Sequence, residues 1–244
     1  MFDRQKYKRF AKVQLQNRWL PVIFITLFTA IISSFFSIPD YMRIYNSDGF
    51  KMLLSGQWSL DAIRQITEAE NSLPANQTFL LSMIQLIIAE ILEVAALNVY
   101  LKMTRSPDKV PFSAFIEGFN NWGRAVLGIL WQFLWVLLWS FLFVIPGIIK
   151  YIAYSQMFFI IAEYDNVSVT KAMRISMIIT KGHKWELFVM GLSFIGWILL
   201  GIITLHISDL FVTPYMKLSF VNAYHGMLKE AVETGRIRPE DLTE

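Results

Sequence analysis

Two glutamates lie within a long apolar stretch, where an ionised side chain is costly. Glu90 and Glu93 are three residues apart, so in a helix they project from one face. A charge at the bilayer centre costs roughly 2.5–3.5 kcal/mol on insertion scales, so these carboxyls must face a protein interior or a polar cavity, or be protonated. The functional interpretation is a proton relay or a cation site. In the structural alternative, one glutamate pairs with Lys217 or Lys150 and the other lies nearer the inner interface.

A second polar stripe occurs near the end of the chain. Asp209, Thr213 and Lys217 are spaced four apart, which places them on one helix face. A lysine near the middle of a span needs a carboxylate partner, and we expect Glu90 to be that partner. Pro214 either frees a backbone carbonyl and kinks the helix for function, or only shapes its packing. The candidate intramembrane polar residues are therefore Glu90, Glu93, Asp209 and Lys217.

The residue types that catalysis and metal binding require are not arranged for either purpose. There is no cysteine, and His183, His206 and His225 are too dispersed for metal-ligand spacing. The sequence contains no Gly-rich phosphate loop, no GxSxG elbow and no HExxH motif. We therefore expect no catalytic residue, no metal, no cofactor and no enzymatic activity. Nucleic acid is not an expected partner.

The elements that position these residues are expected to be membrane-spanning helices. Hydrophobic residues make up 55% of the chain, charged residues 17%, and the mean hydropathy is +0.45. The apolar residues fall in blocks long enough to cross a bilayer, separated by short charged stretches. The sequence thus predicts an all-α, polytopic membrane domain over 1–228, with a polar outer connection at 39–78 and a charged tail at 229–244. The six predicted spans are 19–38, 79–101, 124–145, 148–163, 186–205 and 207–228.

The distribution of basic residues predicts the orientation. With the N-terminus inside, the inner segments hold six Lys or Arg in 1–18, four in 102–124, four in 163–185 and three in 229–244, which is seventeen of 22. Arg43, Lys51 and Arg64 are outside, with Lys150 near them. This asymmetry predicts both termini in the cytoplasm of a plasma-membrane protein. It also requires a hairpin at Pro146-Gly147, because otherwise the later basic loop would be outside.

Three cytoplasmic entry points resemble one another and predict a threefold internal repeat. Each has an amphipathic segment, then tryptophan and a cation, then a hairpin of spans. The segment at 1–18 is either an interfacial helix or a solvated basic tail. Lys181-Gly182-His183-Lys184 is either a site for an anionic lipid head group or a helix end with ordinary inner-side charge. The predicted interfacial anchors and head-group contacts are Arg18, Trp19, Trp122, Arg124, Lys181, His183, Lys184 and Trp185.

The last third of the chain carries a set of residues specific enough to compare with known families. The set is Ile145-Pro146-Gly147, Tyr151, Tyr154, Glu163-Tyr164, Ala172, Ser176, Lys181-Gly182-His183-Lys184, Phe188, Leu192-Ser193-Phe194-Ile195-Gly196-Trp197 and Pro214-Tyr215. In these residues the chain resembles an uncharacterised family of bacterial integral membrane proteins. That family is similar in layout to the membrane domain preceding some glycerophosphodiester phosphodiesterases. The resemblance implies a six-helix bundle in a bacterial inner membrane, and it implies no activity.

Two kinds of function fit these features, and an intramembrane enzyme acting on lipid is the remaining alternative. The first is non-enzymatic: transport, shielding or organisation of a lipid, small amphiphile or peptide, with membrane lipids as partners. The second is a structural or regulatory subunit of another membrane complex, or a homo-oligomer. A transporter needs a water-accessible interior around Glu90 and Lys217. A subunit needs a seam of small residues that faces outward; the candidates are Gly191, Ser193, Gly196 and Gly201.

Overall fold

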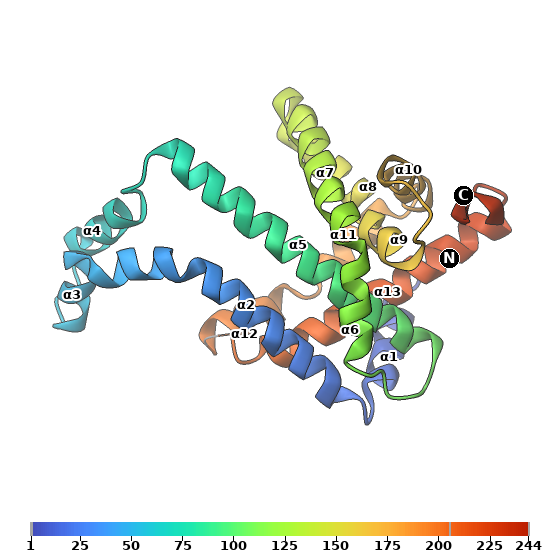
Figure 1. The fold of residues 1–244 in the computed structure, drawn as a ribbon, viewed down its shortest axis with the longest axis horizontal. Helices are drawn as coiled ribbons and strands as arrows, with labels where there is room; N and C mark the ends of the chain where they lie inside the picture. The colour runs from blue at the N-terminus through green and yellow to red at the C-terminus, as the bar shows by residue number, and fades with distance from the viewer. Residues whose placement is uncertain (1, 205, 244) are drawn as a thin grey trace. The chain divides into compact units, whose positions relative to one another are not determined.

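A computed structural model describes residues 2–204 and 206–243, and all regular structure in these residues is helical (Figure 1). The α-helices are α1 (Arg4–Leu15), α2 (Trp19–Asn46), α3 (Asp48–Leu54), α4 (Leu60–Glu70), α5 (Ala75–Arg105), α6 (Ser113–Gly118), α7 (Trp122–Leu142), α8 (Val144–Tyr154), α9 (Met157–Glu163), α10 (Val169–Ile179), α11 (Lys184–Leu192), α12 (Ile195–Ile203) and α13 (Asp209–Glu233). Two 3₁₀ turns complete the fold, η1 (Phe119–Asn121) and η2 (Pro239–Leu242). The all-α prediction is therefore confirmed.

The chain divides into two compact units. The larger comprises Met1–Leu27 and Glu90–Glu244, and the smaller comprises Phe28–Ala89. In the smaller unit the polar connection is helical: Ser59 caps α4 by accepting a hydrogen bond from the Ala62 backbone N–H at 3.1 Å, with Asp61 in the first turn. Helices α3 and α4 pack so closely that a Cβ on Gly49 would lie 2.3 Å from the Ala62 carbonyl oxygen.

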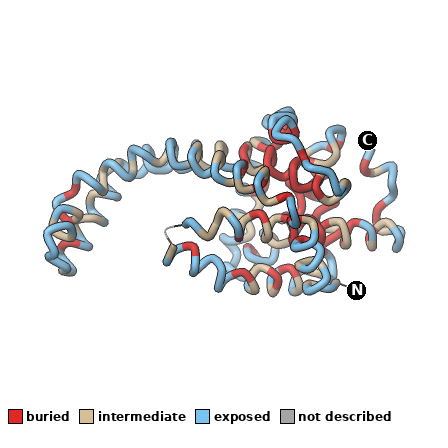
Figure 2. Tube along the Cα trace, turned by 90° about the horizontal axis from the view of Figure 1, so that it is seen from below, coloured by how far each residue is buried: buried red, intermediate tan, exposed pale blue. Residues whose placement is uncertain are grey.

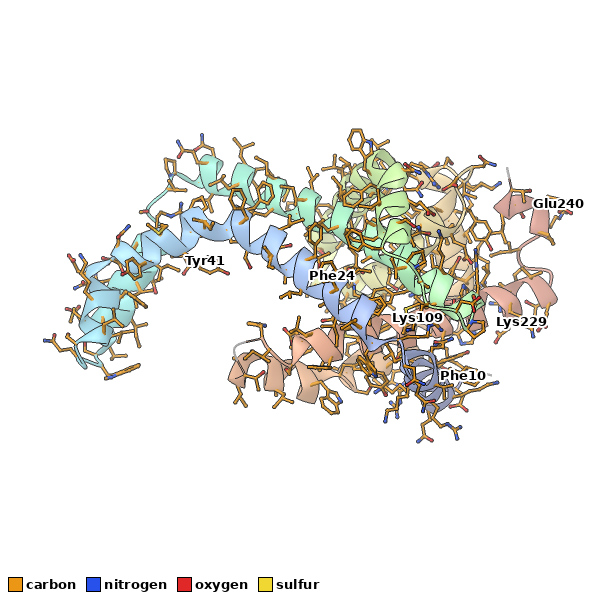
Figure 3. The ribbon with its side chains drawn as sticks, turned by 60° about the horizontal axis from the view of Figure 1, so that its bottom comes forward. Phe10, Phe24, Tyr41, Lys109, Lys229 and Glu240 are labelled. Atoms are coloured by element: carbon orange, nitrogen blue, oxygen red, sulfur yellow. The ribbon has the colours of Figure 1, made fainter. Side chains whose placement is uncertain are left out.

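The core of the larger unit lies where the second half of α5 meets α9, α10 and α13. Buried residues concentrate on these elements. Figure 2 shows the buried residues along the Cα trace in red. The largest of them include Leu97, Ile160, Ile179 and Tyr224. Apolar side chains along α2 instead project from the ribbon, for example Phe24 and Tyr41 (Figure 3), which are 56% and 60% exposed. That exposure is expected of helix surfaces in contact with lipid.

Helix α1 packs against α13, although 1–18 was predicted to be either an interfacial helix or a solvated tail. Asp3 caps α1 through a 3.0 Å hydrogen bond from the Lys6 backbone N–H, and Ala11 and Leu15 are fully buried. Gln14 and Asn222 exchange side-chain hydrogen bonds of 2.8 and 3.2 Å. The solvated-tail alternative is therefore wrong for this helix, because its apolar stripe has a protein partner.

The tight hairpin after α7 is present, but the break falls three residues earlier than Pro146. Phe143 is extended (φ −162°, ψ 151°), and Pro146 lies in the first turn of α8. Proline is tolerated there because a first-turn N–H has no partner within the helix. Gly147 allows the two helices to approach, since a Cβ there would lie 2.2 Å from the Ser140 Oγ.

Among the described residues, five helical segments are long and apolar enough to cross a membrane: Trp19–Asn46, Ala75–Arg105, Ser113–Leu142, Val144–Glu163 and Lys184–Ile203. They correspond to the first five predicted spans. The fifth was predicted to end at Leu205, which lies outside the described residues. The first span is longer than 19–38 because α2 continues through Pro39. Helix α13 is not among the five, so the sixth span is not confirmed, and the internal repeat also stays a prediction.

Candidate functional site

The structure assigns Lys217 a different partner from the one predicted. Its ammonium group forms an ion pair with Oε1 of Glu93, whereas Glu90 was the expected partner. The two glutamates are one helical turn apart on α5, and the packing of α13 brings the lysine to the later one. Lys150, the other suggested partner, lies over the ring of Trp139 with its Nζ 4.4 Å from the ring centre.

Glu90 lies beside this pair without being bonded to it. Its Oε1 is buried and has no hydrogen-bond partner among the described residues. It is within electrostatic reach of Glu93 and Lys217. The Lys217 and Glu93 side chains are only 25% and 32% exposed. This polar group is therefore partly enclosed and mostly ion-paired, which weakens the interpretation as an open transport path.

Asp209 does not join the Glu93–Lys217 pair. Its Oδ2 lies 2.7 Å from Nδ1 of His206, at the start of α13. It also packs against Gly201 of α12, where a Cβ would lie 2.4 Å from Oδ1. The predicted stripe of Asp209, Thr213 and Lys217 is thus divided between two local environments.

Two of the predicted head-group contacts bind backbone carbonyls instead. Both terminal nitrogens of Arg18 donate to the Met103 carbonyl at 3.2 Å, and the residue is only 7% exposed. Arg124 donates to the carbonyls of Ile161 at 3.0 Å and Tyr164 at 2.8 Å, and also to that of Val167. Cations favour the last turn of a helix because its carbonyls lack intrahelical partners. The predicted lipid contact is therefore wrong for the buried Arg18, and Arg124 is engaged in the same way.

His183 is likewise engaged within the protein. Its Nε2 lies 3.0 Å from Oε1 of Glu230, and its ring stacks on Phe2 with centres 5.8 Å apart. Arg236 binds the same carboxylate at 2.9 Å. His183 and Arg236 thus meet at one carboxylate, near the C-terminal end of α13.

The other predicted anchors remain near the surface. Trp122 is 60% exposed and Trp185 is 70% exposed, whereas Trp19 contacts the Phe211 ring at 5.9 Å. Gly182 has φ +92°, the left-handed conformation expected of a helix end, and Lys181 and Lys184 flank this corner. The conformation of Gly182 fits the helix-end interpretation, and the lipid contact of this corner stays a prediction.

A cluster around Glu163 was missed by sequence reasoning. The Glu163 side chain is 4% exposed at the end of α9, and it is ion-paired to Arg105 from the end of α5. The Tyr224 hydroxyl donates to Oε2 at 2.5 Å, and Nε2 of His225 lies 3.2 Å from Oε1. The only sequence signal was the Glu163-Tyr164 pair within the family resemblance. The cluster joins the ends of α5 and α9 to the second half of α13, and each partner contacts the Glu163 carboxylate.

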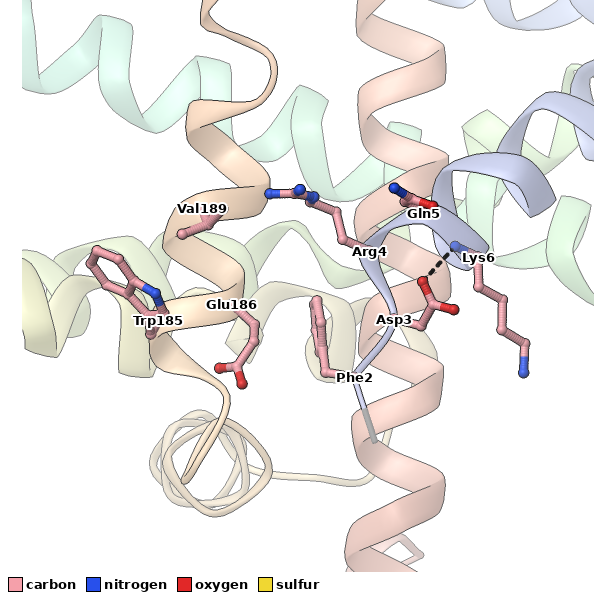
Figure 4. A pocket seen from close by; sticks show the side chains of 8 residues that line it. All are labelled: Phe2, Asp3, Arg4, Gln5, Lys6, Trp185, Glu186 and Val189. Atoms are coloured by element: carbon pink, nitrogen blue, oxygen red, sulfur yellow. Dashed lines mark hydrogen bonds between the residues drawn. The ribbon is translucent and has the colours of Figure 1, made fainter.

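An open pocket of about 640 Å³ lies between the first residues of the chain and the start of α11 (Figure 4). Its apolar wall comprises Phe2, Trp185 and Val189, and charged groups on both sides include Arg4 and Glu186. The pocket adjoins the predicted basic corner. It is at the beginning of the candidate span Lys184–Ile203, so we place it at the membrane interface.

A second hollow, an apolar groove of about 390 Å³, lies on the other side of α11, against α8. Its walls include Ile148, Tyr151, Leu187 and Phe188. Two candidate spans form it, so its surroundings in a membrane are hydrocarbon. The ring of Phe188 contacts Trp185 of the pocket, with centres 5.5 Å apart. The pocket and the groove are therefore adjacent.

The predicted small-residue seam on α11 and α12 is divided. Asp209 covers Gly201, and Ser193 accepts a 2.6 Å hydrogen bond from Nζ of Lys8. Gly191 and Gly196 face open space, with no other atom within 4 Å of an added Cβ. Of these two, Gly191 lines the apolar groove. At Gly191 the outward face of α11 is thus part of the groove. The four small residues do not form a continuous seam for helix packing.

Comparison with known families identifies one matching segment. Residues 141–231 match the model of a family described as "Protein of unknown function (DUF975)". The segment runs from the end of α7 into α13, so it contains the groove, Glu163 and Lys217. Searches of curated proteins and of solved structures find no match. The likeness to phosphodiesterase membrane domains remains a prediction. Over residues 141–231 the chain is therefore similar to an uncharacterised protein family, and its own helices are apolar enough for a multi-pass membrane protein.

Proposed function

We propose that the protein holds a membrane lipid or similar amphiphile at the cytoplasmic interface, as a non-enzymatic carrier or organiser. The observation that carries this proposal is the adjacency of the charged pocket and the apolar groove through the Trp185–Phe188 contact. A molecule with a polar head and an apolar tail fills both hollows at once. Lipids are the amphiphiles in greatest excess at this depth, so the tail in the groove is an acyl chain.

Filling the groove tests this function. In Gly191→Leu the new side chain occupies the groove, so the purified protein is expected to retain about fivefold less lipid, counted by native mass spectrometry after detergent extraction. Gly196→Leu is the matched control, because its side chain also enters open space but lies outside the groove. Equal lipid retention in the two variants would contradict the proposal and favour the alternative role as a subunit of another complex.

We also propose that α13 is a sixth span, which places both termini in the cytoplasm. Its 25 residues measure about 37 Å, enough to cross a hydrocarbon core of about 30 Å. Its limited hydropathy has a physical reason: polar residues such as Ser219 and Asn222 are buried against protein and do not face lipid. The excess of basic residues on the inner segments supports this orientation.

Single cysteines test the topology without background, because the chain contains none. Lys229→Cys, at a position 77% exposed near the C-terminal end of α13, is expected to resist a membrane-impermeant maleimide in intact cells and to react after permeabilisation. Gln57→Cys in the outer connection is the control, and it is expected to react in intact cells. Labelling of both positions without permeabilisation would indicate five spans.

The proposed threefold repeat is supported by the basic residues at the three entry points. Arg18 binds a carbonyl in the last turn of α5, and Arg124 binds the carbonyls at the end of α9. His183 contacts Glu230 in the last turn of α13. In each module the residue that opens the first span therefore contacts the end of the last helix.

A further inference from the structure

The pocket beside α11 contains charges of both signs that are not used elsewhere. Among the residues that the structure describes, neither Arg4 nor Glu186 has an ion pair or a side-chain hydrogen bond. In Figure 4, Arg4 extends toward the side of α11 that bears Val189, whereas Lys6 points away from α11. Arg4 and Glu186 are both partly buried in the pocket wall. The pocket thus presents one unpaired cation and one unpaired anion to the same space.

The start of α11 adds donors for a negative group. The residue before the helix, His183, makes no side-chain capping hydrogen bond. The first backbone N–H groups of a helix lack internal partners and carry partial positive charge. Phosphate is the anion such groups commonly bind, together with a guanidinium. Arg4 therefore provides the phosphate-binding group, and the helix start adds partial positive charge to the pocket.

The opposite wall suits a cation. Glu186 supplies a carboxylate, and the exposed ring of Trp185 supplies an aromatic face that attracts ammonium groups. The charged lining consists of Asp3, Arg4, Lys6 and Glu186, so it is neutral overall. A neutral lining does not favour a head group with net negative charge, which needs a surplus of cations.

From these charges we propose that the pocket binds a zwitterionic phospholipid head group, in which a phosphate diester is joined to an ammonium group. This inference rests on the proposed function and names its ligand class. The phosphate contacts Arg4, and the ammonium group lies between Glu186 and Trp185. The acyl chain passes Phe188 into the apolar groove. The volume of about 640 Å³ is within the range of small-ligand sites, about 300–1,000 Å³.

Lipid competition tests the head-group class. The full chain is placed in vesicles of equal phosphatidylethanolamine and phosphatidylglycerol, extracted, and its retained lipids are counted by native mass spectrometry. The expected preference for phosphatidylethanolamine is about fivefold, the range of one partly exposed ion pair. Glu186→Gln removes the preference, and Arg4→Ala lowers retention of both lipids. Arg9→Ala is the matched control and keeps the preference, because this exposed arginine of α1 does not line the pocket.

The outcomes separate the two proposals. Equal retention of both lipids by the unmodified chain, with loss in Gly191→Leu, overturns the head-group assignment and leaves the lipid function intact. Retention of neither lipid overturns both. In the last part of the experiment, free phosphoethanolamine is added in excess. It is expected not to displace the lipid, because it lacks an acyl chain. Displacement would show that the site takes the soluble head group and would overturn the lipid assignment.

Discussion

Replacing Glu163 with alanine is expected to lower the free energy of unfolding by about 3 kcal/mol, the range for removing one member of a buried charged pair. The substitution leaves the fully buried Tyr224 hydroxyl without its acceptor and removes the partner of Arg105 and His225. For a chain of this size the change corresponds to a fall of about 6–12 °C in the unfolding midpoint. Circular dichroism of the detergent-solubilised protein measures it.

Two further variants test whether the burial of Glu163 is the cause of the expected loss of stability. Arg105→Ala is expected to lose only about 1 kcal/mol, because this arginine is 57% exposed and Glu163 keeps two other partners. Glu233→Ala is the surface control: its carboxylate is 65% exposed and 3.8 Å from Lys229, so almost no change is expected. Equal midpoints for Glu163→Ala and Glu233→Ala would show that the cluster does not stabilise the fold.

Replacing Lys217 with methionine is expected to cost about 3 kcal/mol, since Glu93 is then left without a cation and close to Glu90. Removing both members of the pair should recover most of this loss. In Lys217→Met/Glu93→Leu, apolar side chains replace both charges, and such replacements of enclosed ion pairs are often neutral or stabilising. The unfolding midpoint is again the measurement.

The single variant Glu93→Leu completes the cycle. It leaves Lys217 near Glu90, whose unpaired carboxyl oxygen is available as a new partner, so we expect a smaller loss than in Lys217→Met. A double variant no more stable than Lys217→Met would contradict the expected coupling. Such a result would indicate that the lysine contributes by packing and that its charge matters little.

Local features of the fold could be predicted because interactions between residues close in sequence determine them. Ser59 and Ser168 cap the helices that follow them, and Gly182 adopts the left-handed conformation at a helix end. Apolar blocks gave the candidate spans, since their length and composition alone meet the demands of a bilayer. In such cases a few neighbouring residues decide the structure.

The candidate site was less predictable because its partners are distant in sequence. An arginine at a membrane entry looks the same whether it binds a head group or, as Arg18 does, the carbonyl of a residue 85 positions away. Glu90 and Glu93 share a helix face, so only the packing of α13 decides which of them receives Lys217. The groove depends on two spans that pattern analysis can place but cannot pair.

Because α1 packs against α13, α1 can reach its native position only after α13 has been synthesised. Gln14 and its partner Asn222 are 208 residues apart, and at about 5–20 residues per second the ribosome needs about 10–40 s to make that length. Throughout this interval the apolar stripe with Ala11 and Leu15 has no native partner. Until α13 has been synthesised, the membrane interface can bury this apolar stripe. We therefore expect the segment 1–18 to lie at the membrane interface in the nascent chain, and α1 to dock only after α13 has been made.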